Sequence, residues 1–151
     1  MFYYFLALFM GLAIAMQSPI NASLGRALQA SPLVASLCSF FIGTLCLLLI
    51  AVINGELNIT LFQNLPKQEW WKFLGGVLGA FFVFGTILIA PKIGLVSMFI
   101  IMLVGQLLTS LILDSIGAFD LNTKAITWQK ITGLVIILAG LGLYFSKEIK
   151  I

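Results

Sequence analysis

The chain consists of long apolar stretches separated by short segments that hold nearly all of its charged residues. A helix needs roughly 20 apolar residues to cross a bilayer core, and helices suit that core because their backbone hydrogen bonds are internal. The pattern predicts an all-α membrane protein in which residues 1–151 form a single membrane domain. Five transmembrane helices are expected, at approximately residues 3–25, 32–53, 70–90, 93–113 and 127–146.

Residues near the expected ends of these stretches support the boundaries. Pro32 follows Ser31, which places a proline at the first position of the second helix and a capping residue before it. Trp70, Trp71 and Trp128 stand where the third and fifth stretches begin. Indole rings favour the headgroup layer of a membrane, so we expect these tryptophans to anchor the helix ends there.

The composition of the chain excludes several classes of functional site. Hydrophobic residues make up 62% of the chain, charged residues make up 9%, and histidine is absent, whereas soluble domains carry roughly 25% charged residues. Without histidine, neither a His-containing triad nor a His-ligated metal site can form. We therefore expect no enzyme, metal, cofactor or nucleic-acid partner, and we interpret Cys38 and Cys46 as small buried thiols.

The basic residues carry little information about orientation in the membrane. Five spans place the chain ends on opposite sides, and each side then receives four lysines or arginines. The positive-inside rule gives almost no preference in such a case. Either the tie is chance, or the chain inserts both ways and pairs as an antiparallel homodimer, a ten-helix inverted repeat of the kind that many transporters build within one chain. One side holds Lys67, Lys72, Lys124 and Lys130, and the other holds Arg26, Lys92, Lys147 and Lys150.

Polar residues inside the first stretch are candidates for a binding site. Gln17 and Asn21 are four residues apart and share a helix face. Pro19, between them, removes a backbone hydrogen bond and frees the carbonyl of Ala15, so we expect a helix kink there. Either the two amides merely hydrogen-bond a neighbouring helix, or they bind substrate on a broken helix like those that line transporter sites. We favour substrate binding.

A second polar stripe lies in the fourth stretch. Gln106, Ser110 and Asp114 recur every four residues and therefore lie on one helix face. We expect Gln106 and Ser110 to bind substrate. Asp114 is either a solvated residue that ends the helix before Gly117, or a carboxyl in a cavity, where desolvation would favour its protonated form and permit proton coupling.

Small residues indicate where helices approach one another closely. Membrane helices meet best where glycine lets their backbones come together. We expect Gly75, Gly79, Gly133 and Gly140 to serve such packing. The pattern does not say whether the partner helix belongs to the same chain or to a second copy.

Three segments that together cover most of the chain carry recognisable patterns: GLAIAMQSPINASLGRALQASPLVASLCSFFIGT, GGVLGAFFVFGTILIAPKIGLVSMFIIMLVGQLLTSLILDSIGAF and KITGLVIILAGLGLYFS. Their most specific parts are the pattern around Gln17, Asn21 and Gly25, and Gly105-Gln106-Leu107 followed by Asp114. By these patterns the chain resembles the short YdcZ-like branch of the drug/metabolite transporter superfamily.

The resemblance implies five helices per unit, with a ten-helix form reached by pairing or by gene fusion. In the four-helix small multidrug resistance relatives, a first-helix glutamate binds both the proton and the cationic substrate. This sequence has no acidic residue between Met1 and Gly55. That departure argues against export of lipophilic cations by the same mechanism.

Together these features predict a small-solute transporter of the bacterial inner membrane that works by alternating access. Its expected partners are a second, antiparallel copy of itself, a small-molecule solute and the lipid bilayer. Two other interpretations stay open. One is a passive channel formed by the same dimer, and the other is a membrane assembly subunit without a transport pathway.

Overall fold

The computed structural model describes residues 1–146, and this part of the chain contains helices and no strands. Lys147 and Lys150, which enter the charge comparison, lie outside the described residues. The prediction of an all-α chain with five apolar helices of membrane length is confirmed. These helices are α1 (Phe2–Ala27), α2 (Pro32–Ile53), α4 (Leu74–Ile93), α5 (Leu95–Ile116) and α6 (Trp128–Phe145).

The helix ends follow from local chemistry. Pro32 occupies the first turn of α2, as expected, although the Ser31 side chain makes no capping hydrogen bond. Gly94 ends α4 because its φ of 81° lies in a region that favours glycine. A 3₁₀ turn, Trp70–Phe73, precedes α4, so the apolar segment runs from Trp70 to Ile93.

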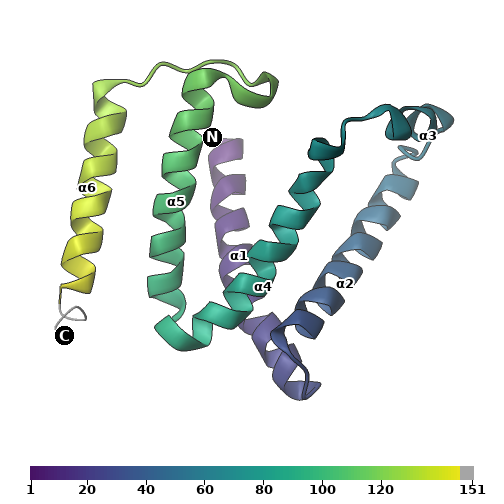
Figure 1. Cartoon of the computed structure of the whole chain (residues 1–151), viewed down its shortest axis with the longest axis horizontal. Helices are drawn as coiled ribbons and strands as arrows, with labels where there is room; N and C mark the ends of the chain where they lie inside the picture. The colour runs from purple at the N-terminus through teal and green to yellow at the C-terminus, as the bar shows by residue number, and fades with distance from the viewer. Residues whose placement is uncertain (147–151) are drawn as a thin grey trace. The chain divides into compact units, whose positions relative to one another are not determined.

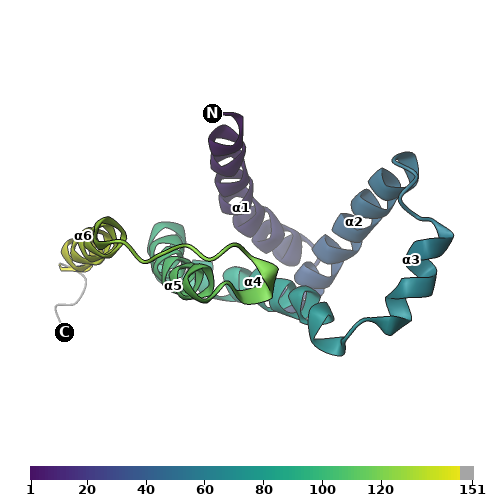
Figure 2. The same cartoon turned by 90° about the horizontal axis from the view of Figure 1, so that it is seen from above.

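By its internal contacts the chain divides into two compact units, Met1–Gly94 and the segment from Leu95 onward. In the first unit, α1, α2 and α4 pack where the end of α1, the start of α2 and the middle of α4 come together (Figure 1). From there α1 and α2 diverge (Figure 2). The core of this junction is Ala35, Val83 and Ile87, with Ala22, Phe40 and Phe82 packed against it.

Small residues permit this close approach. A Cβ atom built on Gly25 of α1 would lie 3.3 Å from the Cβ of Ala35 on α2. One built on Gly79 of α4 would lie 3.5 Å from the Phe40 ring. In contrast, a Cβ built at the other three predicted packing positions, Gly75, Gly133 or Gly140, would meet no atom within 4 Å in residues 1–146 apart from its chain neighbours and the backbone of its own helix. A role of those three glycines in helix packing stays a prediction.

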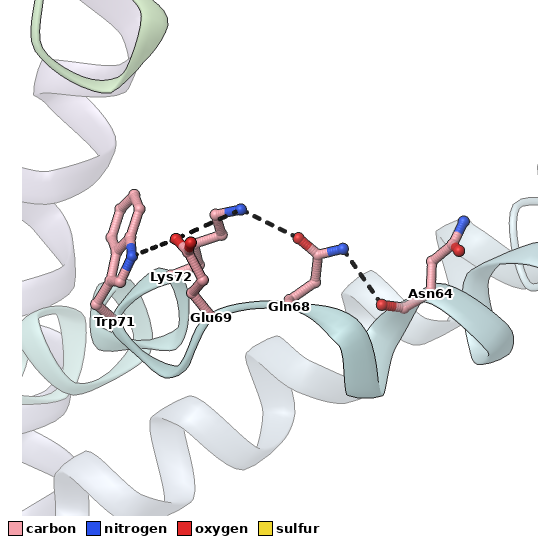
Figure 3. Close-up of polar contacts among 5 residues, drawn as sticks. All are labelled: Asn64, Gln68, Glu69, Trp71 and Lys72. Carbon is pink, nitrogen blue, oxygen red and sulfur yellow. Dashed lines mark hydrogen bonds and ion pairs between the residues drawn. The ribbon is translucent and has the colours of Figure 1, made fainter.

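The connection between α2 and α4, residues 54–73, contains α3 (Ile59–Asn64) and the 3₁₀ turn Leu65–Lys67. Figure 3 shows its exposed hydrogen-bond chain. Gln68 donates to the backbone oxygen of Asn64 at 3.2 Å, and Lys72 donates to Gln68 Oε1 at 3.2 Å. Trp71 Nε1 donates to Glu69 Oε2 at 2.6 Å, and Lys72 pairs with the same carboxylate at 3.9 Å. Exposed polar groups of this kind belong outside the hydrocarbon core.

The second unit contains α5, α6 and the loop that joins them (Figure 1). Gly117, with a φ of 62°, ends α5 and is followed by the 3₁₀ turn Ala118–Asp120. The loop then returns to the end of α5, where the backbone N–H of Lys124 donates to the carbonyl of Asp114 at 2.8 Å.

Candidate functional site

The polar residues of α1 lie in the half of the helix that enters the three-helix junction. Ser18 and Asn21 are buried and Gln17 is half-buried. α1 continues through Pro19 without interruption, and its ribbon changes direction in its second half (Figures 1 and 2). A proline inside a helix removes one backbone hydrogen bond and permits such a bend.

The buried hydroxyl groups of this region have partners. Ser18 Oγ donates to the carbonyl oxygen of Thr86 on α4 at 3.4 Å, which joins α1 to α4. Thr86 Oγ1 donates to the carbonyl of Val83 at 2.9 Å. These bonds satisfy the two hydroxyl donors inside an otherwise apolar junction.

The side-chain amide of Asn21 differs from these hydroxyl groups. Asn21 is 5% exposed, and its Nδ2 atom has no hydrogen-bond partner among residues 1–146. A buried donor without an acceptor destabilises a fold by about 1–3 kcal/mol, and such groups are rare enough to require an explanation. If the Asn21 amide merely joined two helices, its Nδ2 atom would donate to an acceptor on a neighbouring helix. The described part of the chain offers none.

A cavity of about 340 Å³ opens near the turn between α1 and α2. Its α1 wall begins at Ala22, directly after Asn21. Two of its residues, Arg26 and Gln29, carry polar side chains. The complete lining is Ala22, Gly25, Arg26, Gln29, Ala30, Pro32, Ile87 and Pro91.

The polar stripe of α5 belongs to the second unit and is more open. Gln106 and Ser110 are exposed. Ser110 and Asp114 line a cavity of about 300 Å³ between α5 and α6, together with Lys130. The Asp114 carboxylate pairs with Lys124 Nζ at 3.7 Å, with 35% of its side chain exposed.

These features fit the interpretation of Asp114 as a partly solvated residue at a helix end. Its role in proton coupling stays a prediction. Gln17 and Asn21 lie in the first unit, whereas Gln106, Ser110 and Asp114 lie in the second. Their convergence on one binding site also stays a prediction.

The comparison with known families decides the assignment. The family model described as "Putative inner membrane exporter, YdcZ" matches residues 2–143. The chain belongs to the YdcZ family. It is therefore a multi-pass protein of the inner membrane, in agreement with its five apolar helices. No curated protein and no solved structure matches the chain at a significant level.

The described part of this YdcZ-family chain has no cluster of three or more histidine, cysteine, aspartate or glutamate side chains that could hold a metal ion. Cys38 is half-buried and Cys46 is exposed, and both are free thiols. The expectation of a buried thiol is wrong for Cys46, because the second half of α2 lies beyond the junction with α1 and α4 and has no buried residues.

The sequence interpretation missed three polar residues of the first unit. Thr86 was hidden in a long apolar stretch, and its contact with Ser18 depends on how α1 crosses α4. The sequence patterns assign Arg26 only a charge in a loop and assign no role to Gln29. A signal was present for Arg26, since Ala22, Gly25 and Arg26 follow the i, i+3, i+4 spacing of one helix face, whereas Gln29 lies beyond the end of α1.

Proposed function

We propose that this YdcZ-family chain exports a small solute by alternating access, as an antiparallel homodimer, and that it has no enzymatic activity. The observation that carries the proposal is the buried Asn21 amide without an acceptor. This atom is buried in the present conformation, so a solute that offers a carbonyl, hydroxyl or carboxylate oxygen would satisfy the donor when the junction of α1, α2 and α4 opens during transport. In this proposal, Gln17, Gln106 and Ser110 contribute the other polar contacts of a central site.

The chemistry around Asn21 favours a ligand over a defect in packing. The neighbouring Ser18 and Thr86 hydroxyls both have acceptors, so the junction supplies partners for polar groups that serve structure. Asn21 is the exception. Amides recognise neutral and zwitterionic groups because they both donate and accept.

Two further features support movement and pairing. Pro19 removes a backbone hydrogen bond from α1 close to the Asn21 amide. Discontinuous helices are common at the binding sites of alternating-access transporters. α6 has no buried residues within the described chain, so its surface is available to lipid or to a second copy. The equal division of basic residues between the two sides permits that copy to insert in the opposite orientation.

Efflux from proteoliposomes tests the proposal. The purified chain is reconstituted in vesicles loaded with a uniformly ¹³C-labelled bacterial metabolite extract, and mass spectrometry measures which compounds leave. We expect one or a few solutes to leave, and Asn21→Leu to retain them. Asn54→Leu is the matched control, because Asn54 is exposed at the end of α2 and its amide already donates to Glu56.

Two outcomes would contradict the proposal. One is loss of the same solutes from vesicles that contain Asn21→Leu. The other is retention of every compound by vesicles that contain the folded unsubstituted protein.

A further inference from the structure

The cavity near the α1–α2 turn has a polar end and apolar walls. Arg26 and Gln29 provide its charged and amide side chains, while Pro32, Ile87 and Pro91 provide much of its apolar surface. Its volume of about 340 Å³ lies at the lower end of the range for small-molecule sites, about 300–1,000 Å³. The cavity therefore suits a small ligand with one polar end.

The charge of Arg26 is not neutralised by the described part of the chain. The two ion pairs found in residues 1–146 are Lys72 with Glu69 and Lys124 with Asp114, and Arg26 belongs to neither. No carboxylate lines the cavity. A guanidinium group presents a planar set of donors that matches a carboxylate or a phosphate with two parallel hydrogen bonds. The cavity thus offers an exposed cationic fork that pairs with no carboxylate of the described chain.

The backbone at Gln29 supports a role for its side chain. α1 ends in a Schellman motif, in which Gln29 N–H donates to the Arg26 carbonyl at 3.1 Å and Ala30 N–H donates to the Gly25 carbonyl at 2.9 Å. Gln29 occupies the left-handed position of this motif, with a φ of 51°. Glycine is the usual residue there, since a side chain disfavours that conformation. The chain thus places an amide in the cavity wall at a position where glycine would be less strained.

We propose that this cavity binds the oxyanion head, a carboxylate or a phosphate, of a small amphipathic molecule. Arg26 and Gln29 hold the head, and Ile87 and Pro91 cover the apolar body. If this ligand is the exported solute, then the solute is an organic anion; this part of the inference rests on the proposed function. The phosphate of an anionic lipid has the same head-group chemistry and is the other source to distinguish.

Binding of small aromatic probes tests the inference. The full chain is placed in phosphatidylcholine nanodiscs, and the dissociation constants of radiolabelled phenylacetate and phenyl phosphate are measured by scintillation proximity. Phenethylamine provides the same apolar body with a cation. We expect at least one anion to bind, phenethylamine not to bind, and Arg26→Gln to weaken anion binding at least tenfold, since a tenfold change corresponds to about 1.4 kcal/mol.

Three further variants sharpen this test. Arg26→Lys keeps the charge without the fork, and we expect an intermediate loss of affinity. Gln29→Gly should weaken anion binding and yet raise the midpoint of thermal denaturation, because it removes the amide and relieves the left-handed backbone. Lys67→Gln is the charge-matched control, since Lys67 is exposed on the α2–α4 connection and lies outside the cavity lining. It should bind the anions as the unsubstituted chain does.

Each remaining outcome has a defined meaning. Equal anion binding by Arg26→Gln, or equal binding of phenethylamine, would overturn the oxyanion site. In nanodiscs that contain phosphatidylglycerol, native mass spectrometry counts retained lipid. Lipid retention that depends on Arg26, without phenylacetate or phenyl phosphate binding, would identify the ligand as lipid and overturn its assignment as solute. Absence of all anion and lipid binding would overturn the inference while leaving the Asn21 efflux test unaffected.

Discussion

Replacement of Asn21 by leucine removes a buried donor that has no acceptor, and we predict that it raises the stability of the protein. Asn21 is 5% exposed and its Nδ2 atom lacks a partner within residues 1–146. Leaving such a donor unsatisfied costs about 1–3 kcal/mol. In a detergent micelle the unfolded helix also keeps part of its side chains in apolar surroundings, so we expect a gain of about 1 kcal/mol. For a chain of this length, about 2–4 °C in the midpoint of thermal unfolding corresponds to each kcal/mol.

Helix content followed by circular dichroism during heating measures this effect. The matched comparison is Ser18→Ala, which removes a buried hydroxyl that does have a partner, the carbonyl of Thr86 at 3.4 Å. That substitution should lower stability by about 0.5–1 kcal/mol. The two changes lie on adjacent turns of α1 and are expected to move the midpoint in opposite directions. A lower midpoint for Asn21→Leu would mean that the amide has an acceptor in the assembled protein, and would refute its assignment as a free donor for solute.

Two other predictions follow from the packing and the charges. Gly25→Val should lower stability by about 1–3 kcal/mol, because even a Cβ atom at this position would lie 3.3 Å from the Cβ of Ala35. Gly75→Val, at a position with open space around it, should change stability far less. Equal losses measured by thermal unfolding would contradict the close packing of α1 and α2. For the topology test, Cys38 and Cys46 are replaced by alanine and a single cysteine is added at the N-terminus. This cysteine should react with a membrane-impermeant maleimide from both sides of the inner membrane, because neither side holds an excess of basic residues. Labelling from one side alone would exclude antiparallel pairing.

The helices could be predicted from the sequence because the bilayer reduces the problem to apolar length and charge placement. Pro32 marks a helix start because its ring fixes its own φ, a restriction that operates before any tertiary contact forms. The polar face of α1 could be predicted for the same reason, since a four-residue spacing places Gln17 and Asn21 together on any helix.

The environment of each polar residue could not be predicted in this way. Gln17 and Asn21 look equivalent in the sequence, yet only Asn21 is fully buried, because burial depends on where α2 and α4 cross α1. The pairing of Asp114 with Lys124 depends on a loop that turns at Gly117 and returns to the end of α5. No local spacing rule relates residues that far apart.

The cavity beside Arg26 could not be predicted either, because it depends on the backbone conformation of the turn that follows α1. Continued helix periodicity would place Arg26 and Gln29 on one face, but α1 ends at Ala27 and Gln29 lies beyond it. The left-handed conformation of Gln29 is uncommon for a glutamine, and sequence preferences favour glycine there. The turn to α2 that lines the cavity therefore could not be deduced from residue type.

Solute counterflow tests the central claim, transport by alternating access through a site that contains Asn21, most directly. Proteoliposomes are loaded with a concentrated unlabelled bacterial metabolite extract and diluted into a trace of the ¹³C-labelled extract. A carrier exchanges internal for external solute, so the labelled form of the transported compound should accumulate transiently above its final level, and Asn21→Leu should abolish this overshoot. Entry of label without an overshoot would indicate a passive channel, and an overshoot that survives Asn21→Leu would place the binding site elsewhere.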